Sequence, residues 1–312
     1  SQSDAKCIEQ LGLCALNYNV FGYLNECVND DLIVEIESTQ VGRVIKKVIA
    51  DLLSINFSIY STDMVSENLK VLYQLTAFVL NDNEVAETMF EKGQDCGLMS
   101  IYSRSLQSFP LDLPPFVDLS VALAKTSCLN KMLESLFSLT RFTEKFGPHL
   151  LLLVRVEGDN IYKLIKDRSV CNRSSLMIKH GTFAFLSQRE PSQIYITWEN
   201  VDINGLLVLD AIYEEKLNTI YSGFAESNNK ESFDELIAIT RLITAIGEKN
   251  SVYFSTINSL IDNSLKLFKL FTKFHKISRT LIASILNGFS TWIVNDAVPS
   301  SKIWELISDS AL

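Results

Sequence analysis

Residues 64–106 read MVSENLKVLYQLTAFVLNDNEVAETMFEKGQDCGLMSIYSRSL and contain the clearest helical pattern in the chain. In the first part, apolar side chains recur at helical spacing, at Leu69, Leu72, Leu75, Phe78 and Val79. Residues 81–83 favour a turn and a new helix start, and Gly93 favours the left-handed end of a helix. The stretch therefore predicts three successive helices, the third beginning near Asp95.

A second stretch, residues 232–272, repeats this apolar pattern without a gap at an offset of 167 residues, as from Leu69 to Leu236. Several apolar pairs match at this offset: Leu72 with Ile239, Leu75 with Leu242, Val79 with Ile246, Leu98 with Leu265, and Ile101 with Phe268. Armadillo and HEAT repeats are about 40–47 residues long, so the offset corresponds to about four such repeats.

These two stretches resemble the armadillo/HEAT family of helical repeats. The resemblance implies an all-α fold, a right-handed α-solenoid of armadillo/HEAT-like repeats, over a single domain of residues 1–312. In this family the inner helix of each repeat lines a concave groove, and the resemblance implies a small and nearly uncharged groove surface here. On that mapping the partner-binding groove contains Tyr73 and Ala77, Thr240 and Thr244, and Ala283 and Asn287. Ala77 and Thr244 stand where peptide-gripping armadillo proteins carry asparagine, and Asn287 lies in a similar context.

The rest of the chain also favours helices. Residues 41–59 predict a helix whose inward residues are Val44, Ile45, Val48, Ile49, Leu52 and Leu53. Adjacent prolines at 114 and 115 predict a longer link over residues 108–115. Residues 150–166 and 171–186 predict further helices. Residues 188–205 have strand-like composition, and we interpret them as an irregular insertion, extended or weakly helical.

Composition narrows the class of protein. The 312 residues include 47% hydrophobic residues but few glycines (12) and prolines (6), which favours long helices over a turn-rich sheet protein. A formal charge of −9 counts against nucleic acid as the main partner. No apolar run is long enough to span a membrane, and the polar start does not resemble a secretory leader. We therefore expect a cytoplasmic or nuclear location with reduced cysteines.

Catalytic and metal-binding patterns do not occur. The sequence has no glycine-rich phosphate loop, nucleophile elbow, paired Cys-x-x-Cys or His-Glu-x-x-His motif. The three histidines, His149, His180 and His275, have no neighbour at metal-ligand spacing. We therefore predict that the protein is not an enzyme and needs no cofactor or metal.

One charged pattern is a second candidate site for partner binding. Four lysines fall on one helical stripe within an arc of about 80°: Lys266, Lys269, Lys273 and Lys276. In an acidic chain, this basic ridge could attract an acidic segment of a partner. An ordinary solvated face explains the same pattern.

The predicted function is non-enzymatic: a scaffold or adaptor that binds a peptide-like or helical segment of another protein on its curved surface. The main alternative is a regulatory domain, autoinhibitory or targeting, of a larger cytoskeletal, ubiquitin-ligase or exchange-factor protein. A nucleic-acid-binding solenoid and an all-helical enzyme are further alternatives. The sequence does not indicate the oligomeric state.

Overall fold

The computed structural model describes residues 18–59, 66–145, 153–156, 161–170, 175–190, 193–199, 202–221, 229–249, 254–271, 278–295 and 300–309, with residues 7, 10, 14 and 15. Most of these residues are helical, which confirms the expected all-α fold in part, but the described residues also contain seven strands. The chain divides into two compact units. The first comprises Ser1–Leu106 with Pro115–Met132, and the second comprises Gln107–Pro114 with Leu133–Leu312. The single domain over residues 1–312 stays a prediction.

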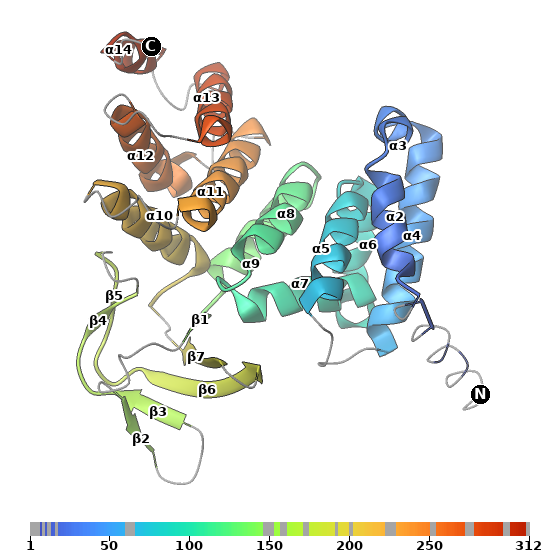
Figure 1. Cartoon of the computed structure of the whole chain (residues 1–312), viewed down its shortest axis with the longest axis horizontal. Coiled ribbons are helices and arrows are strands. Elements are labelled where there is room, and N and C mark those ends of the chain that lie inside the picture. The colour runs from blue at the N-terminus through green and yellow to red at the C-terminus, as the bar shows by residue number, and fades with distance from the viewer. Residues whose placement is uncertain are drawn as a thin grey trace. The chain divides into compact units, whose positions relative to one another are not determined.

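The first unit is built from consecutive helices, drawn from blue to green in Figure 1. They are α2 (Val20–Val28), α3 (Asp31–Ile36), α4 (Gln40–Ile59), α5 (Ser66–Leu80), α6 (Asn83–Lys92), α7 (Gly97–Ser108), α8 (Leu113–Ala124) and α9 (Leu129–Phe137), the last three extending in part into the second unit. Helix α5 packs against both α2 and α4. Its residues Leu72, Leu75, Val79 and Leu80 are almost completely buried.

Helices α5, α6 and α7 confirm the three helices predicted over residues 64–106. The Asp82 side chain caps α6 by accepting hydrogen bonds from the backbone N–H groups of Glu84 (3.0 Å) and Val85 (3.2 Å). Gly93 ends α6 at a φ of 55°, a conformation that disfavours residues with a Cβ. The turn residues therefore act as their chemistry predicts.

The predicted link over residues 108–115 is partly wrong. Helix α8 begins at Leu113, so both prolines lie in its first turn. Backbone N–H groups there have no partner within the helix, and proline loses nothing by lacking one. The adjacent prolines start a helix instead of preventing it.

The second unit contains an antiparallel five-stranded sheet. Its strands are β1 (Arg141–Lys145), β2 (Leu153–Arg155), β3 (Ile161–Leu164), β6 (Phe183–Glu190) and β7 (Gln193–Glu199), in the spatial order β1-β7-β6-β3-β2. The short strands β4 (Arg168–Ser169) and β5 (Met177–Ile178) form a separate pair. Figure 1 shows these strands in green and yellow.

This sheet corrects three expectations. The helices predicted over residues 150–166 and 171–186 are wrong, because strands β2, β3, β5 and β6 lie there. The interpretation of residues 188–205 as an irregular insertion is also wrong over its described strand, since β7 pairs with β1 on one side and β6 on the other. The strands that pair with β7 appear in the sequence only as short apolar runs.

Trp198 of β7 lies at the centre of a polar cluster inside the second unit. The side chain is 1% exposed, and its indole N–H donates to Glu144 Oε1 at 2.7 Å. The same carboxylate pairs with Arg168 Nη1 at 2.8 Å, and the guanidinium lies 5.2 Å from the centroid of the indole ring. This tryptophan therefore fixes the sheet to the β4 segment and is not an exposed binding residue.

The C-terminal helices of the second unit are α10 (Gly205–Tyr221), α11 (Asn229–Lys249), α12 (Phe254–Phe271), α13 (Arg279–Val294) and α14 (Ser300–Asp309), coloured from ochre to red in Figure 1. Helix α11 packs along α13, and α10 packs along α12. Between α12 and α13, the rings of Phe268 and Phe289 meet edge to face at 5.1 Å.

The two stretches that share an apolar pattern agree in burial and differ in helix number. Leu72, Leu75 and Val79 of α5 are buried, as are their counterparts Ile239, Leu242 and Ile246 of α11. The first stretch then breaks at Gly93, whereas α12 runs without interruption from residue 254 to residue 271. The shared pattern therefore describes one buried helix face well and the following helices less closely.

We expect Trp198→Phe to lower the free energy of unfolding of the second unit by about 1–3 kcal/mol, because it removes the hydrogen bond to Glu144 and part of a buried ring. Thermal and urea unfolding would measure the loss. The matched control is Trp304→Phe, at a side chain that is 63% exposed, where we expect a change within about 0.5 kcal/mol. Equal effects of the two substitutions would contradict the role given to Trp198.

Candidate functional site

Helix α4 has one face directed into the first unit. Along 20 residues it buries side chains or backbone at Gly42, Lys46, Ile49, Ala50 and Leu53. At 100° per residue these positions fall on one side of the helix. This inward face packs against α5 and α6. It accounts for the stability of α4 in the unit.

The opposite face of α4 is also apolar, and it is exposed. The exposed fractions are 59% for Val41, 53% for Val44, 54% for Val48, 41% for Leu52 and 49% for Ile55. These five residues follow one another at spacings of three, four, four and three, so they cover an arc of about 80° and a length of about 21 Å. We call these five residues the α4 stripe.

An apolar row of this kind calls for an explanation. Single exposed apolar residues are common on protein surfaces, but contiguous ones mark interaction sites. Side chains at i, i+3, i+7 and i+11 are the positions through which a helix contacts another helix. Three of the five residues are valine, which is not favoured on an exposed helix surface by intrinsic propensity. The α4 stripe is therefore the strongest candidate for a binding surface.

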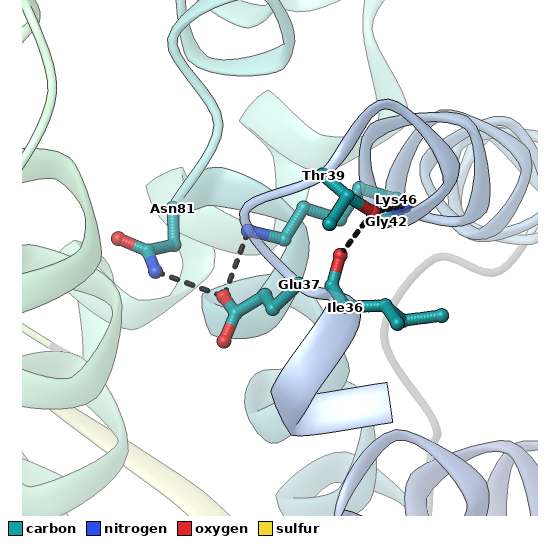
Figure 2. Close-up of polar contacts among 6 residues, drawn as sticks. All are labelled: Ile36, Glu37, Thr39, Gly42, Lys46 and Asn81. Carbon is teal, nitrogen blue, oxygen red and sulfur yellow. Dashed lines mark hydrogen bonds and ion pairs between the residues drawn. The ribbon is translucent and has the colours of Figure 1, made fainter. Parts of the chain in front are cut away.

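A polar cluster behind α4 holds the helix in this orientation (Figure 2). The Lys46 amine pairs with Glu37 Oε1 at 2.8 Å, and the Asn81 amide donates to the same oxygen at 3.0 Å. The Lys46 side chain is only 5% exposed, and its amine also lies 5.2 Å from the centroid of the Phe78 ring. We call Glu37, Lys46 and Asn81 the polar latch. It connects the end of α3, the middle of α4 and the turn after α5.

The turn from α3 to α4 is closed by short-range contacts that Figure 2 also shows. The Thr39 hydroxyl donates to the carbonyl of Ile36 at 2.6 Å and accepts from the backbone N–H of Gly42 at 3.3 Å. A Cβ at position 42 would lie 2.3 Å from the Ile36 carbonyl oxygen. Glycine is therefore required here, because the first turn of α4 passes directly against the end of α3.

The polar latch determines which residues of α4 face outward. Lys46 and Val48 point in directions about 160° apart around the helix axis. Since the Lys46 amine must reach a carboxylate inside the unit, Val48 and its neighbours in the stripe point away from it. Rotating α4 so that the stripe faces inward would separate the charged groups of Lys46 and Glu37.

The carboxyl of Glu37 has a pKa below its ordinary value of 4.5. Burial alone would raise the pKa, but the hydrogen bonds from Lys46 and Asn81 and the charge of Lys46 outweigh it. The ionised carboxylate is thus the form that the fold stabilises. The unfolded chain binds this proton more readily, so the contribution of Glu37 to stability is present above pH 4.5 and lost as the pH falls further.

Three of the four predicted groove residues are not on a surface. Tyr73, Thr240 and Thr244 are between 0% and 4% exposed, so the prediction that they line an open groove is wrong. Both threonines donate to the carbonyl four residues earlier in α11, at 2.8 and 2.7 Å, which satisfies a hydroxyl within a packed helix. Asn287 is exposed on α13, as is Ala283.

The buried threonines belong to a core contact instead. Tyr213 of α10 approaches Thr240 of α11 and Ser264 of α12, and burial raises the pKa of its phenol to about 12 while these two hydroxyls lower it. The Tyr213 ring is completely buried. These residues hold helices of the second unit together and have no access to a partner.

The basic ridge is described only in part. Lys266 and Lys269 are exposed on α12, which agrees with an outward-facing ridge, and the Lys266 amine donates to Asn263 Oδ1 at 3.0 Å. Lys273 and Lys276 lie outside the described residues. The four lysines as one surface therefore stay a prediction.

The exposed α4 stripe was not predicted, although the sequence carries a signal for it. Val44, Val48 and Leu52 were assigned inward positions together with Ile45, Ile49 and Leu53. Only Ile49 and Leu53 are buried. Nine apolar positions between residues 41 and 55 are more than one helix face can bury, which indicates a second apolar face.

No protein-family model matches this chain, and no curated protein has a significantly similar sequence. Within the described part of the chain, none of the helices combines the length and the hydropathy that a membrane crossing requires. Among the same residues, no three histidine, cysteine, aspartate or glutamate side chains gather as a metal site would need. Any inference about the function of this protein therefore rests on its structure.

We expect Glu37→Gln to lower the free energy of unfolding by roughly 1–2 kcal/mol at neutral pH, because the Lys46 amine loses a charged acceptor. The difference from the wild type should shrink as the pH falls below 4.5, where the wild-type carboxylate also takes up its proton. Urea unfolding at a series of pH values measures this. Glu35→Gln, at an exposed carboxylate of α3, is the control with little expected change. An unchanged difference across the pH series would contradict the polar latch.

Proposed function

We propose that this protein is a non-enzymatic scaffold or adaptor that binds a segment of another protein chain, and that the α4 stripe is its docking surface. The observation that carries the proposal is the exposure of five apolar side chains along one face of a helix whose other face is fixed in the unit. The buried positions of Tyr73, Thr240 and Thr244 move the proposed surface from the groove to α4.

The chemistry of the stripe favours a helical, apolar ligand. Full burial of a Val, Leu or Ile side chain contributes about 1.5–3 kcal/mol, so covering the exposed half of each adds roughly 1 kcal/mol per residue. Five such residues provide roughly 5 kcal/mol before a cost of association of at least about 4 kcal/mol, so the stripe by itself supports only a weak complex and the apolar face of the partner must add to it. A helix with apolar residues at i, i+3 and i+7 presents the matching surface.

We also propose that the helical parts belong to an armadillo/HEAT-like α-solenoid. The equivalent burial of α5 and α11 and the three-helix order α5-α6-α7 support this proposal. A cytoplasmic or nuclear location is part of the same proposal. It is supported by the five described cysteines, Cys7, Cys14, Cys27, Cys96 and Cys128, which are all free thiols.

The test is the double substitution Val44→Glu with Val48→Glu. Two charges in the apolar contact should weaken partner binding at least about tenfold, since each must be desolvated without a counter-charge. Affinity capture with quantitative mass spectrometry, followed by titration of the captured partner, measures the loss. Because both positions are about half exposed, the unfolding temperature should hardly change.

Gln94→Glu is the matched control, because it adds a negative charge at an exposed position of the same unit outside the α4 stripe. A second comparison is Lys266→Glu with Lys269→Glu on the basic ridge. A partner that is lost only in this lysine variant would place binding on α12. A partner that both the stripe variant and the lysine variant retain would contradict both surfaces.

A further inference from the structure

The α4 stripe has the same spacing in both directions along the helix. From Val41 the steps are three, four, four and three residues to Ile55, and from Ile55 back they are identical. Val48 is the midpoint. We propose that the stripe binds a second copy of this chain, with the two α4 helices antiparallel and a two-fold axis at Val48. This inference rests on the proposed function and specifies a second copy of the chain as the binding partner.

A two-fold axis at Val48 matches every residue of the stripe with an apolar residue of the second copy. Val48 contacts Val48, Val44 lies opposite Leu52, and Val41 lies opposite Ile55. Such an interface is isologous, because the same patch serves both copies. Each opposing pair combines a larger and a smaller side chain, or two valines, so no two large side chains face each other at the interface.

The charges beside the stripe also fit an antiparallel second copy. Lys47 and Asp51 are exposed on the same flank of the stripe. In an antiparallel pair equal flanks meet, so Lys47 of each copy comes beside Asp51 of the other, offset by about 3 Å along the axis. The pair forms twice in the dimer. In a parallel pair opposite flanks meet instead, and neither residue finds an opposite charge.

The two Lys47 side chains also approach each other at the axis, where they are offset by about 3 Å along it. Each Lys47 amine also lies 2.6 Å from Glu84 Oε1 in its own copy, which weakens the repulsion between the two lysines, and Asp51 of the other copy would share the amine with Glu84. The flank therefore presents charges of both signs to the second copy. A surface selected for an acidic or basic partner would instead carry an uncompensated charge of one sign.

The size of the stripe predicts a reversible dimer. A single helix face of about 21 Å is small compared with the interfaces of stable complexes, which bury about 1,600 Å². The net charge of −9 on each copy adds repulsion that salt screens. We expect association that grows with protein concentration and is stronger in moderate salt than in low salt.

The experiment uses site-directed cross-linking in the full chain. Cys7, Cys14, Cys27 and Cys171 are first replaced by serine, which leaves the buried thiols Cys96 and Cys128. Val48→Cys is then treated with a short bismaleimide. We expect a covalent dimer in high yield, because the two thiols meet at the axis. Arg43→Cys, also exposed on α4 but far around the helix from the stripe, is the matched control and should give at least about tenfold less dimer.

A mixed cross-link tests the antiparallel direction. Val44→Cys and Leu52→Cys should cross-link efficiently when the two variants are mixed and poorly when each is alone. Sedimentation of the wild type should show a dimer that Val48→Glu converts to monomer, and Gln94→Glu should leave the dimer intact. Cross-linking of Val44→Cys alone that matches the mixture would overturn the antiparallel arrangement.

Three outcomes overturn the second copy as the partner. A wild type that stays monomeric up to about 100 µM is the first. The second is a dimer that Val48→Glu leaves unchanged. The third is a Val48→Cys thiol that a small maleimide cannot label in the monomer, which would show that another segment of the same chain covers the stripe. If the chain is monomeric but the stripe variant still loses a different protein, the proposed function stands and only the choice of partner is wrong.

Discussion

The ion pair between Lys46 and Glu37 is the constraint on which the first unit depends. A lysine amine that is almost fully buried must keep an acceptor, because an isolated charge in an apolar interior costs several kcal/mol. The only way for α4 to satisfy this requirement is to hold one rotation about its axis. Asn81 extends the requirement to the turn between α5 and α6, so three segments of the chain are positioned by one carboxylate. The rotation of α4 about its axis is therefore set by a polar contact. That rotation determines which of its apolar residues face outward.

This arrangement separates the residues that stabilise the unit from those of the proposed binding surface within one helix. The inward residues Ile49 and Leu53 contribute to the core of the unit, while the outward residues Val44 and Val48 contribute little to it because they remain about half exposed. Substitutions on the outward face can therefore alter association without unfolding the chain. The two faces have different surroundings, so one face can be changed by substitution without changing the other.

Periodicity in the sequence identified the helices of residues 64–106 and their ends, because Asp82 and Gly93 have local chemistry that does not depend on distant partners. It failed for the sheet, since runs such as Ile161–Leu164 are too short to distinguish a strand from a helix, and their partners lie up to about 60 residues away. The family resemblance also misplaced Tyr73 and Thr240. It assigned them to a groove, whereas tertiary packing buries them. The α4 stripe was visible as an excess of apolar residues, but only the structure shows which of them remain uncovered.

The strand order of the five-stranded sheet has a consequence for how this protein avoids unwanted partners. Its longest strands, β6 and β7, are interior, whereas the edges are formed by β1 with five residues and β2 with three. Edges of that length offer few backbone groups to an incoming strand, and the Thr143 N–H of β1 already donates to the Phe109 carbonyl at 2.7 Å. Arg141 and Lys145 also place charges along β1. The sheet is thus a poor template for strand addition and for fibril growth. The association that we propose would instead use a side-chain surface on a helix, which a single added charge would weaken.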